Sequence, residues 1–227
     1  MSLAGRLDRT IAGVDGCKAG WVVVSIPAGQ SLRVDVHQAF SDLLEALDGN
    51  ALVAVDMPIG LPDLAGKGGR GPEQMVRPLI GARQSSVFAI PSRTAIFAEP
   101  GPFADIEAWS SAHRRASAVA RATSDPPRGV SIQAFGLFSK IREIDTALRA
   151  ESSLQERVFE SHPEVAFWRL NGEVAMMAPK KMKGRINVPG MEERKSLLAG
   201  NGLSRAFLDQ PTPRGACLLY TSDAADE

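Results

Sequence analysis

The sequence predicts an α/β domain with a helical insertion. Two runs of small and β-branched apolar residues, at 11–14 and 52–55, contain no polar alternation and are typical of buried strands. Helix-like patterns cover residues 106–123 and 131–149. No internal repeat and no linker long enough to separate two domains is visible, so we expect a single domain at 10–209.

The N-terminal part predicts two strands, a short helix and a third strand. Residues 10–26 and 31–40 are expected to pair as a hairpin, because turn-forming proline and glycine residues separate them. A short helix is expected at 42–48, where Gly49 would end it. The apolar run that closes at Asp56 is the next strand.

The middle of the chain is rich in glycine, proline and arginine. Residues 61–91 predict loops with one short helix at 73–81, and this segment is a candidate substrate lid. Further along, residues 155–159 predict a strand and residues 191–199 a helix.

Composition indicates an ordered, water-soluble protein. Of the 227 residues, 44% are hydrophobic and 6% aromatic, which is ordinary for a globular domain. The 26 basic and 26 acidic residues cancel, so any contact with a polyanion must be local. No stretch approaches the roughly 18 apolar residues that span a bilayer, and the N-terminus lacks a signal-peptide core, so we expect a cytoplasmic protein with no membrane contact.

Three carboxylates follow predicted strands and form a candidate catalytic and metal-binding set. Asp15 and Asp56 close the two apolar runs, and Glu160 follows the strand expected at 155–159. Phosphodiester cleavage by two Mg²⁺ or Mn²⁺ ions about 3.5–4 Å apart uses several converging carboxylates. A single aspartate at a strand end is also a common turn or helix-cap residue.

His162 is a fourth catalytic candidate. It lies two residues after Glu160, so the two side chains share a face if the segment is extended. It could be a metal ligand, a proton shuttle or a phosphate contact, or a hydrogen-bonded turn residue before Pro163.

Two segments are candidates for substrate binding. Arginines and serines near residue 85 could bind a phosphate through guanidinium groups and hydroxyls, and a lysine-rich loop after residue 179 could follow a nucleic-acid backbone. Solvated surface side chains would account for both segments as well. The candidates are Arg83, Ser85, Ser86, Arg93, Lys180, Lys181 and Lys183.

Four motifs resemble a known family. They are Val-Asp-Gly-Cys-Lys-Ala-Gly-Trp at 14–21, Val-Asp-Met-Pro-Ile-Gly-Leu at 55–61, Gly-Ala-Arg-Gln-Ser-Ser-Val-Phe at 81–88 and Glu-Ser-His-Pro-Glu at 160–164. In this order they resemble the DUF429 family, whose members are described as predicted RNase H-like nucleases. The resemblance covers roughly residues 10–205. It implies an RNase H-like mixed five-stranded sheet flanked by helices, whose first strand carries a metal-binding aspartate.

The C-terminus departs from this resemblance. RNase H-like nucleases usually complete the site with an acidic residue on a C-terminal helix, and this chain lacks the family-like acidic segment there. Residues 210–227 show no helical apolar pattern and resemble a translated sequencing adapter, so we expect a non-native or disordered tail on a truncated chain. Residues 1–9 are expected to be an N-terminal tail.

Three functions are compatible with these patterns. The first is a metal-dependent nuclease acting on nucleic acid with Mg²⁺ or Mn²⁺. The second is an ATP-dependent phosphotransferase or ATPase on an RNase H-like core, in which the turn at 15–20 would bind phosphate. The third is a non-catalytic binding module.

Overall fold

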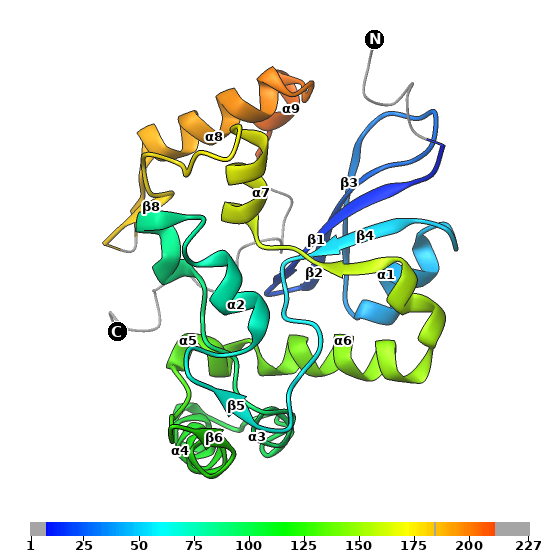
Figure 1. Ribbon diagram of the computed structural model, residues 1–227. Helices are drawn as coiled ribbons and strands as arrows, with labels where there is room; N and C mark the ends of the chain where they lie inside the picture. The colour runs from blue at the N-terminus through cyan, green and yellow to red at the C-terminus, as the bar shows by residue number, and fades with distance from the viewer. Residues whose placement is uncertain (1–7, 184, 212–227) are drawn as a thin grey trace. The chain divides into compact units, whose positions relative to one another are not determined.

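The computed structural model describes residues 8–183 and 185–211 (Figure 1). These residues form two compact units. Unit 1 contains the described residues up to 57, those at 79–83 and those from 151 onward. Unit 2 contains residues 58–78 and 84–150, which correspond to the expected helical insertion.

Unit 1 is built on a five-stranded mixed sheet. The strand order is β3-β2-β1-β4-β7. β1 is antiparallel to β2 and parallel to β4, and β7 continues parallel to β4. This sheet flanked by helices confirms the α/β prediction and is compatible with an RNase H-like fold. The strands are β1 (Ile11–Cys17), β2 (Gly20–Ile26), β3 (Arg33–His37), β4 (Leu52–Val55) and β7 (Val158–Glu160).

Three strands, rather than the expected two, precede the first helix. Residues 10–26 reverse direction between β1 and β2, where Cys17 pairs with Gly20. Gly20 has a φ of +131°, and a Cβ there would clash with the backbone carbonyl of His37. Only glycine fits this crowded position without strain, so it permits the tight reversal that splits the run. The expected hairpin is present between β2 and β3, across the turn where the Gln30 N–H donates to the Pro27 carbonyl at 3.0 Å.

The two faces of the sheet differ in burial. Val14, Trp21 and Val55 lie on one face and are almost wholly buried. Trp21 makes an edge-on contact with Phe40 of α1 (Phe40–Ala46), with ring centroids 5.1 Å apart. The opposite face carries more exposed residues, including Ile11.

Helix α1 begins and ends two residues earlier than expected. Ala39 is its N-cap residue, and the carboxylate of Asp42 accepts a hydrogen bond from the Ala39 N–H at 3.1 Å. The acidic residue thus lies in the first turn and reaches back to the cap, as in a capping box.

The C-terminal part of unit 1 is helical with one small hairpin. The strand expected at 155–159 is a 3₁₀ turn up to Glu156, and β7 starts only at Val158. Helix α8 is longer than the predicted 191–199. The elements are η3 (Ser152–Glu156), α7 (Pro163–Leu170), β8 (Lys181–Met182), β9 (Arg185–Ile186), α8 (Val188–Gly200) and α9 (Arg205–Leu208).

Unit 2 consists mainly of helices around an aromatic core. The Phe135 ring lies 5.1 Å from Trp109 and 5.2 Å from Phe138, measured between centroids. The single helix expected at 131–149 is divided, because Gly136, a poor helix former, ends its first part. The elements are β5 (Ala65–Gly66), α2 (Gly71–Val76), α3 (Arg93–Phe97), α4 (Ile106–Ala122), β6 (Ser124–Asp125), α5 (Ile132–Gly136) and α6 (Phe138–Ala150). The 3₁₀ helix η2 (Gly81–Ser86) has its first three residues in unit 1 and its last three in unit 2.

The glycine-rich loop before α2 is fastened by a buried ion pair. The Arg70 guanidinium binds the carboxylate of Glu73, and both side chains are 4% exposed. Arg70 also donates to the carbonyl of Ile59. The predicted helix at 73–81 is therefore α2, shifted toward the N-terminus, and the lid role of this segment stays a prediction.

Across the two described ranges, no helix has both the length and the apolar character required to cross a membrane. Of the tails expected at 1–9 and 210–227, residues 1–7 and 212–227 lie outside the described residues.

Candidate active site on β1 and β4

Asp15, within β1, and Asp56, directly after β4, lie side by side where the parallel pairing of the two strands ends. β1 and β4 are parallel, and Val14 is level with Val55. The next residue after each valine is an aspartate, so the two aspartates are neighbours. The Asp56 N–H donates to the Val14 carbonyl at 2.9 Å, which keeps the two chains together at this point. Because side chains alternate along strands, both carboxylates project from the face opposite the buried valines.

The surroundings of Asp56 disfavour its charged form. Burial, followed by the charge of Asp15, raises the pKa of Asp56 to about 7, with a further rise from Glu160. The ammonium group of Lys180 opposes this by lowering the pKa of Asp56. Two carboxylates that interact this strongly with each other and with one cation form a single electrostatic site.

Asp15 shows the same balance with one additional contact. Burial raises the pKa of the Asp15 carboxyl, while a hydrogen bond from the Gly16 N–H and the charge of Lys180 lower it. Lys180 is thus the cation common to both aspartates.

Glu160 lies on the neighbouring strand but one position out of step. The register of β4 and β7 puts Glu160 level with Val55 rather than with Asp56. The Ser161 N–H donates to the Val55 carbonyl at 2.9 Å, which holds that register. Glu160 is exposed and influences the pKa of Asp56, and its role as a metal ligand stays a prediction.

No three His, Cys, Asp or Glu side chains converge into a metal-binding group within the described part of the chain. The pair Asp15 and Asp56 still fits a hard divalent cation. Mg²⁺ is commonly held by one or two protein carboxylates, with waters and substrate phosphates completing its octahedron. A cation would also relieve the repulsion that raises the pKa of Asp56.

Hydrogen bonds to α8 hold the segment that carries Lys180. The Glu193 carboxylate accepts the N–H groups of Met177 and Ala178 at 2.8 and 3.0 Å. On the other side of Lys180, the Asn187 N–H donates to the Lys180 carbonyl at 2.9 Å. The lysine is therefore presented by a segment anchored at both ends.

A buried ion pair joins α7 to α8. Glu164 and Arg194 are each 4% exposed and form two hydrogen bonds of 2.7 Å. Arg194 also lies over the Phe167 ring, 5.5 Å from its centroid, and donates to the Ala178 carbonyl at 2.8 Å. Glu164 thus has a structural partner within this pair, although the sequence groups it with Glu160 and His162.

His162 is the N-cap residue of α7. Its Nδ1 atom accepts the N–H of Glu164 at 3.2 Å. This contact satisfies one of the backbone donors that every helix start leaves unpaired. The structure thus gives His162 a capping role, and its catalytic role stays a prediction.

The lysine-rich loop forms the β8–β9 hairpin. Lys180, Lys183 and Arg185 are exposed on it, while Lys181 is half-buried. Met182 is 58% exposed between these cations. The hairpin thus presents positive charge and apolar surface together.

The residues predicted to bind phosphate near residue 85 are spread over separate elements. Ser85 and Ser86 end η2, Arg83 lies within it, and Arg93 begins α3. The Arg93 guanidinium forms an ion pair with Asp145, a contact within unit 2. Arg93 therefore supports packing between α3 and α6, and its role in phosphate binding stays a prediction.

Sequence reasoning missed both the Glu164–Arg194 pair and a polar pocket in unit 2 that contains Arg77 and Arg128. Neither has a local signal, because the partners are separated by 30 residues in the pair and by about 50 in the pocket. A buried carboxylate almost always has a partner. Because the chain contains many arginines, the sequence does not show which of them is the partner of Glu164.

The five-stranded mixed sheet, with carboxylates beside its two central parallel strands, defines a mixed α/β protein compatible with an RNase H-like fold. A family model described as "Protein of unknown function (DUF429)" matches residues 13–226, and the chain therefore belongs to the DUF429 family. The matched range includes most of the residues expected to be a non-native tail. Comparisons with curated proteins and with solved structures found no match.

Proposed function

We propose that this protein is a nuclease that depends on Mg²⁺ or Mn²⁺ and hydrolyses phosphodiester bonds in nucleic acid. The observation that carries the proposal is that Asp15 and Asp56 lie side by side, each directly after the last residue pair of the parallel strands β1 and β4, where the charge of Lys180 acts on both. The carboxyl ends of parallel strands are where α/β sheets usually hold their chemistry.

Asp15 and Asp56 would hold the metal ion. When bound, such an ion supplies Lewis-acid polarisation of a phosphoryl oxygen and activation of water. Lys180 would bind the negatively charged phosphate next to the carboxylates, where its charge already acts on both. Glu160 and His162 are further candidates on the adjoining segment.

The β8–β9 hairpin would bind the rest of the strand. Its exposed Lys183 and Arg185 can contact backbone phosphates without reading sequence, which is the usual source of nonspecific affinity. A cytoplasmic location, where nucleic acid and Mg²⁺ are both present, remains part of the proposal.

The test measures cleavage of labelled single-stranded and double-stranded DNA and RNA with Mn²⁺ or Mg²⁺. We expect the parent protein to cut at least one substrate. The cleavage rate should fall more than about 100-fold in Asp15→Asn and in Asp56→Asn. Mutation of a residue that only hydrogen-bonds to a metal ligand already lowers metal affinity or activity about 10–100-fold. Calorimetric titration of Mn²⁺ should show binding to the parent protein and none to either variant.

The matched control is Glu45→Gln, which removes an exposed carboxylate from α1 in the same unit. Its cleavage and metal binding should equal those of the parent protein. Undiminished cleavage by both aspartate variants would refute the site. Absence of both cleavage and metal binding in the parent would favour a non-catalytic binding module, and a strict need for ATP would favour phosphotransfer.

A further inference from the structure

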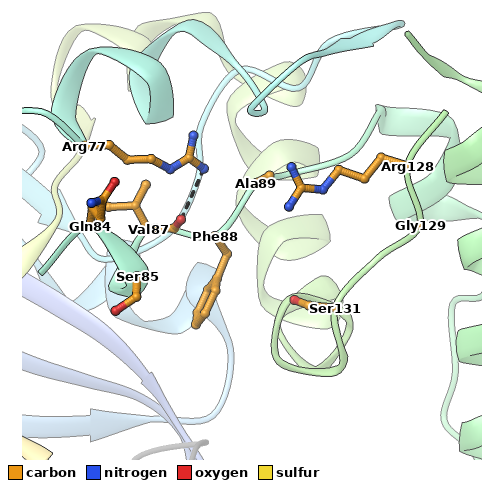
Figure 2. Close-up of a pocket in the computed structure, with 9 residues that line it drawn as sticks. All are labelled: Arg77, Gln84, Ser85, Val87, Phe88, Ala89, Arg128, Gly129 and Ser131. Atoms are coloured by element: carbon orange, nitrogen blue, oxygen red, sulfur yellow. Dashed lines mark hydrogen bonds between the residues drawn. The ribbon is translucent and has the colours of Figure 1, made fainter. Parts of the chain in front are cut away.

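Unit 2 contains a polar pocket of about 460 Å³. Figure 2 shows Arg77 and Ser85 on one side of it and Arg128 and Ser131 on the other, with Phe88 between them. All the lining residues belong to unit 2. The volume is within the range of about 300–1,000 Å³ usual for small-molecule sites.

The charge of the lining is entirely positive. Arg77 and Arg128 line the pocket, and no aspartate or glutamate does so among the described residues. The Arg77 guanidinium is held by the carbonyls of Gly68 and Val87, the latter at 3.2 Å (Figure 2). Its position is therefore set before any ligand arrives, which lowers the entropy cost of binding.

Arg128 is the second cation, and it is available for a ligand. Its guanidinium is exposed and has no hydrogen-bond or ion-pair partner within the described residues. An arginine on each side of one pocket matches the geometry in which guanidinium groups bind phosphate or carboxylate oxygens.

Three neutral groups add further donors. The Ser85 hydroxyl and the Gln84 side-chain amide likewise have no partner in the described part of the chain. The Ser131 Oγ accepts the Ala134 N–H at 3.1 Å, so its own O–H remains to donate. A pocket with this excess of donors favours a ligand rich in acceptor oxygens.

Phe88 provides an apolar wall. Its ring is half-buried in the pocket, next to Val87 and Ala89. An aromatic ring at this position favours a ligand with a planar group that stacks on it, as bases do on aromatic side chains.

We infer that this pocket binds a nucleotide-type phosphate ester, with the phosphate between Arg77 and Arg128 and the planar base against Phe88. Such a group could come from a free mononucleotide or from a nucleotide within a strand. The inference does not depend on the proposed nuclease activity, because no residue of the pocket belongs to the carboxylate site or to its unit.

The test is a titration of the full chain, monitored through the amide chemical shifts of Ser85, Val87 and Gly129. The probes are adenosine 5′-monophosphate, a short oligoadenylate, adenosine and inorganic phosphate. We expect saturable shifts at these amides with one or both nucleotides. Binding of the monophosphate identifies a free nucleotide as the ligand, and binding of the oligoadenylate alone identifies a strand.

Arg128→Gln is the first variant, because this side chain is exposed and lines the pocket. It should weaken nucleotide binding at least about tenfold, equal to about 1.4 kcal/mol. Phe88→Leu should weaken the binding of the nucleotides while leaving the binding of inorganic phosphate unchanged. The matched control, Arg149→Gln, removes an exposed positive charge near the end of α6 and should change nothing.

Two results would overturn the inference. The first is the absence of saturable shifts with both nucleotides. The second is equal affinity for adenosine and its monophosphate, because the arginines would then have no anion to bind. Metal-dependent cleavage can succeed or fail independently of either result.

Discussion

At the residue scale, the ionisation of Asp56 depends strongly on the fold. The sequence places it after an apolar run, and the structure buries it beside Asp15 so that its pKa rises to about 7. Keeping the carboxylate charged in this environment costs free energy, and binding of a metal ion or a proton removes that cost.

We expect Asp56→Asn to stabilise the metal-free protein at alkaline pH. Its pKa is about 7 when folded and about 3.9 when unfolded. Between these values the folded state keeps a proton that the unfolded state loses, so the free energy of unfolding falls as pH rises. The expected gain is about 1–3 kcal/mol near pH 8 and smaller near pH 5, measured by urea denaturation with a chelator.

Glu45→Gln serves as the control for this experiment. Because that carboxylate is exposed, its removal should change stability by less than about 0.5 kcal/mol at either pH. An Asp56→Asn protein that is less stable than the parent near pH 8 would show that the carboxylate is favourably paired instead.

At the element scale, the Glu164–Arg194 pair connects α7, α8 and the segment before Lys180. This one ion pair thereby contributes to the packing of α7, which begins at Pro163, against α8. Removal of one partner would leave the other as an uncompensated buried charge.

Glu164→Gln is expected to lower the free energy of unfolding by about 3–5 kcal/mol. The double variant Glu164→Met with Arg194→Leu should recover most of that loss, since no charge remains buried. Urea denaturation of the parent, the single and the double variants measures both effects.

The control on the same helix is Arg169→Gln, whose ion pair with Glu173 is exposed. It should cost less than about 1 kcal/mol. If Glu164→Gln is as mild as this control, the pair contributes little to the packing of α7 on α8.

At the scale of the whole molecule, the two units have separate cores. Unit 1 is centred on β1 and β4, where Val53 and Val55 are fully buried. Unit 2 is centred on the aromatic cluster around Phe135. The β8–β9 hairpin, by contrast, consists of two-residue strands in which every side chain except the half-buried Lys181 is exposed.

Amide hydrogen exchange should reflect this difference. We expect amides of β1 and β4 to exchange at least about 1,000-fold more slowly than those of the β8–β9 hairpin, because buried central strands open only with much of the fold. Mass spectrometry of exchanged peptides measures the ratio. Similar protection of the hairpin would mean that it is as stably folded as the core strands.

The sequence alone was sufficient for the features that depend on neighbouring residues. Apolar runs identified β1 and β4, and the aspartates were recognisable because each directly follows its apolar run in the sequence. The structure places Asp15 within β1, which continues to Cys17, and Asp56 directly after β4. The motifs around Asp15, Asp56 and Glu160 also indicated the DUF429 family, which the match over residues 13–226 confirms.

Only the tertiary structure decided the features that join distant residues. The register of β7 puts Glu160 level with Val55, and no local pattern encodes such an offset between strands. The Glu164–Arg194 pair and the pocket between Arg77 and Arg128 likewise depend on how helices and loops pack. Local propensity determines where strands and helices form, whereas the partners of their side chains are determined by the packing of the whole chain.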